Sequence, residues 1–225
     1  MTGARDGDRL HGGAYQIEAT LDNGKGDAWL GHSNFARGFR AETAFRTRVD
    51  VLETWGGGGY RFDTARKVLT WIKPFGGAAM THDHSGNFTD HWADVGLAMR
   101  LWRTSTLGCG VMNWHETYKD QRFDGGAGWT RLRSSAVDTV RWLVAGYVGT
   151  EVNYDPEDLF QGSYYELFAN LHLRLFRRLT ADLDVTHHAM FKPGGELQYQ
   201  VQLVRTVLVL ALRHDLWLRT VFDIN

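Results

Sequence analysis

Apolar and polar residues alternate along the last quarter of the chain, residues 164–225. Every second side chain from 165 to 175 is apolar, and the same period returns in 181–185 and 199–203. Turn sequences such as Lys192-Pro193-Gly194-Gly195 separate these runs. A period of two bounded by turns is typical of β-strands with one apolar and one polar face. The pattern predicts paired strands, and our working hypothesis is a membrane-spanning β-barrel.

The alternation extends back to residue 14, so we expect one β-barrel domain over residues 14–225. Several strands match the ~9–11 residues of membrane strands better than the ~5–6 of soluble sheets. The sequence predicts an all-β, antiparallel, up-and-down barrel of about twelve strands, transmembrane in type. The expected strands are 14–21, 27–32, 49–62, 68–80, 88–101, 105–116, 123–133, 140–153, 163–176, 179–190, 197–212 and 216–224.

Three segments depart from this regular pattern. Residues 1–13 have no period, and we expect a disordered lead there. Residues 34–48 are consistent with a short helix or with a loop. The four consecutive glycines 56–59 predict a bend or a β-bulge within one long strand.

Taking the connections between strands alternately assigns them to two ends of the barrel. Longer connections fall at one end (82–90, 116–124, 154–161 and 191–196) and tight ones at the other (62–67, 100–104, 133–141, 176–180 and 212–216). Long loops at one end and short turns at the other are typical of outer-membrane barrels, which place the long loops outside. A soluble up-and-down barrel can share this difference in length.

Charge divides between the same two ends. The long-loop end carries nine acids against three bases; the acids are Asp83, Asp90, Glu116, Asp120, Asp124, Asp155, Glu157, Asp158 and Glu196. The short-turn end carries nine bases against three acids; the bases are Arg66, Lys67, Arg100, Arg103, Arg133, Arg141, Arg177, Arg178 and Arg213. A soluble barrel has less reason to show this split, which therefore favours a fixed orientation in a membrane.

Composition narrows the classes of protein. Lys and Arg number 25 against 26 Asp and Glu, so net charge indicates no nucleic-acid partner. Cys109 is the single cysteine, which excludes a disulfide framework, and we expect a buried or lipid-facing thiol. No apolar run approaches the ~18 residues of a transmembrane helix. No secretory signal opens the chain. Since an outer-membrane barrel must be exported, we expect a fragment or a processed product.

Polar side chains on the non-lipid faces of neighbouring strands are candidates for lining a lumen. Opposite charges there, such as Arg174 against Asp182 and Asp184, can pair across strands. A network that fills the lumen and a lining that selects solutes both fit this set. The alternation slips at Arg205, where a β-bulge would turn this side chain inward. The candidates are Glu166, Asn170, His172, Arg174, Asp182, Asp184, His188 and Arg205.

One histidine group has the spacing of a metal site. His82 and His84 point the same way in a strand, and His91 could complete an open zinc shell. An ordinary polar outer loop is the alternative that the surrounding Ser85-Gly86-Asn87 favours. The acids of 155–158 suit Ca²⁺, with a solvated loop as the favoured alternative. We predict no cofactor, and no Ser–His–acid set stands out.

Tryptophan is abundant, and most of its nine positions lie near the ends of the expected strands. Aromatic girdles at the two membrane interfaces would place tryptophan there. Ordinary packing in a β core is the alternative. The nine are Trp29, Trp55, Trp71, Trp92, Trp102, Trp114, Trp129, Trp142 and Trp217.

Several segments resemble the bacterial domain of unknown function family 5916. They are residues 38–50 (GFRAETAFRTRVD), Gly59-Tyr60-Arg61-Phe62, His84-Ser85-Gly86, Val152-Asn153-Tyr154 and the terminal run from Val204-Arg205-Thr206 to Phe222-Asp223-Ile224-Asn225. The resemblance covers roughly residues 27–225. It implies an exported protein with a carbohydrate-binding family-9-like domain in front of an outer-membrane barrel, a type often labelled membrane-associated hydrolase. It supplies no catalytic residues.

This chain lacks the family's sugar-binding domain and early strands, so we expect an incomplete segment of a larger barrel. The function predicted is an outer-membrane pore, or an anchor for an exported carbohydrate-binding module. The expected partners are a lipid bilayer or lipopolysaccharide, with carbohydrate reached through the missing domain. Two alternatives stay open: a soluble lipocalin-like ligand-binding barrel, and a membrane-associated hydrolase with its site at the long-loop rim.

Overall fold

The computed structural model describes residues 12–36, 50–102, 104–119, 121–176, 178–213 and 215–224. This part of the chain is all β, and none of its elements is a helix long and apolar enough to cross a membrane. Its strands are β1 (Ala14–Asp22), β2 (Gly26–Phe35), β3 (Val51–Tyr60), β4 (Phe62–Asp63), β5 (Leu69–Asp83), β6 (Phe88–Leu101), β7 (Thr106–Tyr118), β8 (Gln121–Val137), β9 (Val140–Asn153), β10 (Phe160–Phe176), β11 (Leu179–Phe191), β12 (Leu197–Ala211) and β13 (Trp217–Ile224).

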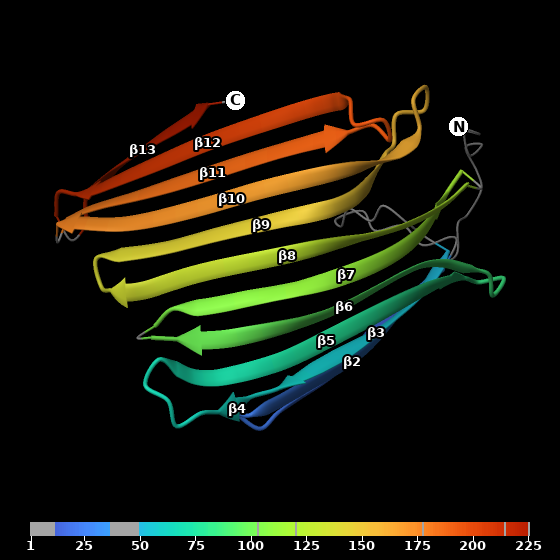
Figure 1. The fold of residues 1–225 in the computed structure, drawn as a ribbon, viewed down its shortest axis with the longest axis horizontal. Coiled ribbons are helices and arrows are strands. Elements are labelled where there is room, and N and C mark those ends of the chain that lie inside the picture. Colours follow the sequence, from blue (N-terminus) through green and yellow to red (C-terminus); the bar gives the residue numbers. More distant parts are fainter. Residues whose placement is uncertain are drawn as a thin grey trace.

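The strands form one antiparallel sheet in which each pairs with its neighbours in sequence, from β1 at one edge to β13 at the other. The two-residue strand β4 lies off this path and pairs with β5. The predicted all-β, antiparallel, up-and-down topology is confirmed. The predicted closure into a barrel is not observed. The sheet curls but stays open, with β1 paired only to β2 and β13 only to β12 among the described residues (Figure 1).

The alternating pattern located most strands well, and β6 and β9 have the predicted bounds. The glycine run contains no β-bulge, because β3 pairs with β2 and β5 through residues 56–59 without a shift in register. A Cβ on Gly57 would lie 2.5 Å from the Trp29 ring, so this glycine admits a neighbouring side chain. Of the uncertain segments, residues 1–11 and 37–49 lie outside the described residues.

The connections differ in length less than the sequence suggested. β7 ends at Tyr118 and β8 begins at Gln121, so the predicted long loop at 116–124 is a tight hairpin. Both strands extend further than their apolar alternation, because polar residues such as Gln121 and Arg122 continue the ladder. The β9–β10 and β11–β12 links, at the same end of the sheet, remain longer than the β8–β9 turn opposite (Figure 1).

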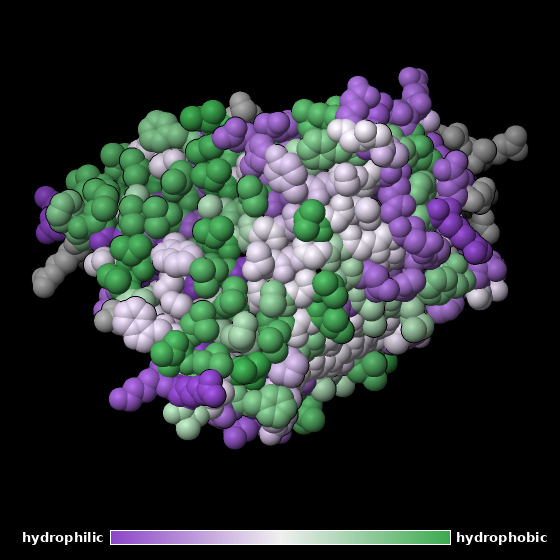
Figure 2. Space-filling view, viewed as in Figure 1, coloured by the Kyte–Doolittle hydropathy of each residue, from purple (hydrophilic) through white to green (hydrophobic). Residues whose placement is uncertain are grey.

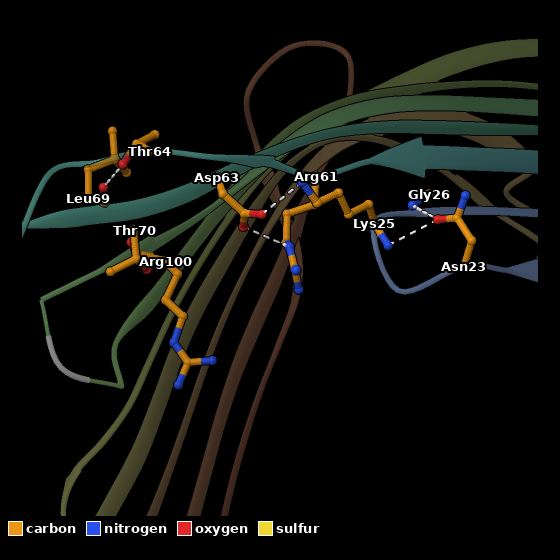
Figure 3. Close-up of polar contacts among 9 residues, drawn as sticks. All are labelled: Asn23, Lys25, Gly26, Arg61, Asp63, Thr64, Leu69, Thr70 and Arg100. Atoms are coloured by element: carbon orange, nitrogen blue, oxygen red, sulfur yellow. Dashed lines mark hydrogen bonds and ion pairs between the residues drawn. The ribbon is translucent and has the colours of Figure 1, made fainter.

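At the short-turn end, the β1–β2 turn is tied to the segment around β4. Asp63 lies 3.0 Å from the Nε of Arg61 and 3.4 Å from the Nζ of Lys25 (Figure 3). The side chain of Asn23 accepts hydrogen bonds from the backbone N–H groups of Lys25 and Gly26, which closes the turn. These contacts join β2, β3 and β4 at this end.

Contacts that skip strands show which way the sheet curls. Glu151 of β9 accepts a hydrogen bond of 2.8 Å from the Tyr199 hydroxyl of β12, across β10 and β11. The rings of Phe75 and Trp129, on β5 and β8, have centroids 6.0 Å apart. Neighbouring strands are about 4.8 Å apart, so side chains three strands apart meet in this way only inside a curve. We call the face that carries these contacts the concave face.

Candidate functional site on the concave face

Charged residues within the strands are almost all on the concave face. Partners across an antiparallel ladder share a face, so the registers assign a side to every strand residue. Of the charged strand residues that the structure describes, only Arg122 and Asp124, at the loop end of β8, lie on the convex face. The concave set is Glu18, Asp22, Asp27, Glu53, Asp63, Lys73, Asp83, Asp90, Asp94, Arg100, Glu116, Arg131, Arg133, Arg141, Glu151, Glu166, Arg174, Asp182, Asp184, Arg205, Arg219 and Asp223.

The eight residues predicted to line a lumen share this concave face. They are Glu166, Asn170, His172, Arg174, Asp182, Asp184, His188 and Arg205. Their common side follows from the register of β10, β11 and β12. That they line a water-filled lumen stays a prediction.

The partners within this set differ from those expected. Asp182 lies 2.6 Å from the Nδ1 of His172, and Asp184 accepts a hydrogen bond of 2.7 Å from the amide of Asn170. Arg174 does not pair with either acid, because its cross-strand partner is Thr180. The hydrogen-bond partners of these two carboxylates are therefore an amide and an imidazole, not the guanidinium group of Arg174.

Arg205 reaches the concave face without the predicted bulge. Its Nε lies 3.7 Å from Asp223 of β13, and the ladder around it is regular. The expected phase of the strand was wrong instead: Tyr199, Val201 and Leu203 share the concave face with Arg205. The glutamines between them, Gln200 and Gln202, lie on the convex face opposite Ala189 and His187.

A cluster around His188 was missed by the sequence analysis. Its ring stacks between Tyr164 and Tyr199, at centroid distances of 5.6 Å and 5.5 Å. Glu151 lies 3.1 Å from its Nε2 and Glu166 lies 3.5 Å from its Nδ1. Two carboxylates and two phenol rings thus hold one imidazole. The sequence did not predict this group because its residues come from strands as far apart as β9 and β12, which are three strands apart in the sheet.

Aromatic rings on the concave face lie against glycine backbone. A Cβ on Gly125 would be 2.2 Å from the Trp114 ring, and one on Gly31 would be 2.1 Å from the Trp55 ring. Each ring occupies the space that a side chain at the glycine would need, and such stacking of rings on glycine is a feature of curved sheets. The predicted interface girdle was therefore wrong for the tryptophans that face inward, which are Trp29, Trp55, Trp71, Trp92, Trp114, Trp129 and Trp217.

The convex face is apolar over most of its area. Val95, Val111 and Val148 lie in the middle of the sheet and are 61%, 59% and 64% exposed. Figure 2 shows hydrophobic side chains gathered over the half of this face nearer the short turns, residues of intermediate hydropathy with scattered hydrophobic ones in the centre, and hydrophilic ones at the long-loop end. Cys109 shares this face with Leu107 and Val111.

The candidate metal residues do not converge. The ring of Phe88 lies beside both His82 and His91, at 5.5 Å and 5.6 Å between centroids. His84 is hydrogen-bonded instead to Asp50 and Asn34, at 2.9 Å and 3.0 Å. In the described part of the chain no three His, Cys, Asp or Glu are arranged to hold a metal ion.

A hydrolase site is also without support in these contacts. The Ser134 hydroxyl bonds to the hydroxyl of Ser105, at 2.8 Å. Among the described hydrogen bonds, none joins a serine hydroxyl to a histidine.

The fold and the two faces define a class: an open, antiparallel, up-and-down β-sheet with a charged concave face and an apolar convex one. No family model, no curated protein and no solved structure matches this chain. The resemblance to family 5916 therefore stays a prediction.

Proposed function

We propose that this chain is part of the wall of an outer-membrane β-barrel, acting as a pore or as an anchor. The observation that carries the proposal is the partition of charge: strand residues with charged side chains face the concave side, apart from Arg122 and Asp124 at one strand end. Membrane barrels alternate lipid-facing apolar residues with polar residues that face the lumen. A soluble ligand-binding barrel needs the reverse, with its apolar face inside.

Exposure of the convex face supports a lipid partner. In water, large side chains such as Val111 and Val148 would leave apolar surface unburied in the centre of the sheet. Burying such surface is favourable by about 25 cal/mol per Å². Acyl chains would cover it without disturbing any strand pairing.

The lengths of the central strands fit a membrane span. β5 to β12 contain from 13 residues, in β7 and β11, to 17 residues, in β8 and β10. About 9–11 residues of a strand tilted by about 45° cross the hydrocarbon layer. The remaining residues would lie in the headgroup region, where the acidic and basic ends of the sheet fall.

The open edges define what the wall still needs. β1 and β13 present unpaired backbone groups on their outer sides, within the described residues. Such groups cannot be left unpaired in hydrocarbon. The proposed barrel closes by pairing both edges with further strands, from this protein or from a second copy.

Two measurements on protein refolded in detergent test this proposal. A folded barrel should migrate differently on a gel before and after boiling, and a pore should give discrete conductance steps in a planar bilayer. A shift in migration without conductance would exclude the pore and leave the anchor. A protein that shows no shift in migration and does not insert into lipid would contradict the proposal. The link to a carbohydrate-binding module depends on the resemblance alone.

A further inference from the structure

Three arginines line one hollow at the short-turn end of the concave face. They are Arg100 of β6, Arg133 of β8 and Arg141 of β9, with Thr106 and Ser134 beside them. All three side chains are exposed, so their guanidinium groups can reach a solute. The hollow is separate from the His188 cluster, which lies nearer the long-loop end.

The register explains why these side chains come together. Thr106 pairs with Arg100 on one side and with Arg133 on the other, so the two arginines are two strand spacings apart, about 10 Å. Arg133 pairs with Leu143, and Arg141 lies two residues further along β9 on the same face. Diagonal neighbours of this kind are about 7–8 Å apart. The concave curl directs all three toward a common volume.

Unlike Lys73 and Arg205 of the same face, these three arginines have no ion pair among the described residues. Lys73 pairs with Asp27, and Arg205 pairs with Asp223. Asp138 lines the same hollow without pairing with any of the three arginines. Figure 3 shows the guanidinium of Arg100 directed away from Asp63, which Lys25 and Arg61 already engage.

We propose that this arginine hollow binds a multiply charged oxyanion of the phosphate class. A guanidinium group offers paired N–H donors whose geometry matches two oxygens of such an anion. The neighbouring Thr106 hydroxyl adds a short-range donor. Three like charges held close together repel one another, and an anion with several oxygens relieves that repulsion. The inference deepens the proposed function, because it names the class of solute for the concave face.

Inorganic pyrophosphate is the probe for this site. Titration into protein refolded in zwitterionic detergent, at constant ionic strength, should show saturable binding that chloride does not reproduce. Arg133→Gln and Arg100→Gln should each weaken binding about tenfold or more, the effect of losing a charge-assisted hydrogen bond. Arg133→Lys keeps the positive charge but loses the paired N–H donors of the guanidinium group. Its affinity for pyrophosphate should therefore lie between those of the unchanged protein and Arg133→Gln.

Arg219→Gln is the matched control, since Arg219 is an exposed arginine of the concave face outside the hollow. It should bind pyrophosphate as the unchanged protein does, and circular dichroism should show that every variant is folded. Binding no stronger than that of chloride, or an equal loss in Arg219→Gln, would overturn the proposal. So would binding to vesicles containing phosphatidic acid that pyrophosphate does not displace, because a lipid phosphate would then be the ligand.

The outcome is separable from that of the proposed function. Binding in detergent requires no conductance, so a protein that binds pyrophosphate but never inserts into bilayers would retain the site and lose the membrane role. If the protein inserts and conducts without binding pyrophosphate, the proposed membrane role stands and the proposed anion site is contradicted.

Discussion

Val111→Arg is the substitution that most sharply separates a lipid-facing from a water-facing convex surface. Val111 lies near the middle of β7, is 59% exposed, and pairs with Val95 and Gly128 on the convex face. At the midplane of a bilayer, a lipid-facing arginine costs about 2–4 kcal/mol, which is roughly a 30- to 1000-fold change in the folding equilibrium. On a water-exposed surface the same change would be within about 0.5 kcal/mol.

The cost should also depend on depth. Leu107 lies on the same face of β7, four residues nearer the short-turn end. Four residues advance about 13 Å along a strand, or roughly 9 Å of depth at a tilt of about 45°. An arginine there approaches the interface, where the cost falls to about 0–1 kcal/mol. We therefore expect Leu107→Arg to be milder than Val111→Arg.

Refolding into phosphatidylcholine vesicles across a urea gradient, followed by tryptophan fluorescence, measures these free energies. Met112→Arg is the matched control, because Met112 is the next residue of β7, lies on the concave face and pairs with Asp94. It should change the free energy of unfolding far less than Val111→Arg does. Equal costs for the two substitutions, or no cost for Val111→Arg, would refute the reasoning.

Three further predictions concern packing, the concave network and pH. Gly125→Ala should lower the free energy of unfolding by about 1–3 kcal/mol, since its Cβ would overlap the indole ring above it, whereas Gly128→Ala, with nothing within 4 Å, should be nearly neutral in the same urea titration. Glu151→Ala should cost about 1–3 kcal/mol by leaving its phenol and imidazole partners unsatisfied, and Glu151→Gln should cost less. Hydrogen bonds from the Asn87 side chain and backbone lower the pKa of Asp83, the last residue of β5, at the loop end of the strand outside the proposed span. The contribution of Asp83 to the free energy of unfolding is therefore complete above the pKa of the unfolded state and is lost as the pH falls through the pKa of the folded state. Asp83→Asn should differ from the unchanged protein in urea midpoint at pH 6 but not at pH 2. A difference that persists at pH 2 would contradict this dependence on pH.

Strand positions were predictable because period-two alternation is local. The bounds of β6 and β9 follow from their own residues and turns. The phase of β12 was not predictable in this way, because the run from Val204 to Ala211 is apolar on both faces apart from Arg205 and Thr206. Pairing with β11 decided it, by aligning Arg205 with Asp184.

The candidate site was predictable only where its residues lie on adjacent hairpins. The shared face of His172 and Asp182 follows from one tight turn between β10 and β11. The approach of Tyr199 to Glu151 depends on the curl of four strands, which no local pattern encodes. The inward tryptophans follow the same principle, since ring and glycine belong to different strands, as with Trp114 and Gly125.

The single cysteine provides the most direct test of the central claim, that the convex face meets lipid and the concave face meets water. Cys109 lies on the convex face, so a fluorophore attached to it can be quenched either by spin-labelled lipid or by aqueous iodide. A Cys109→Ser, Met112→Cys protein carries the same label on the concave face. In vesicles we predict quenching by the lipid at position 109 and by iodide at position 112. Quenching by iodide at position 109, with none by the spin-labelled lipid, would contradict the account.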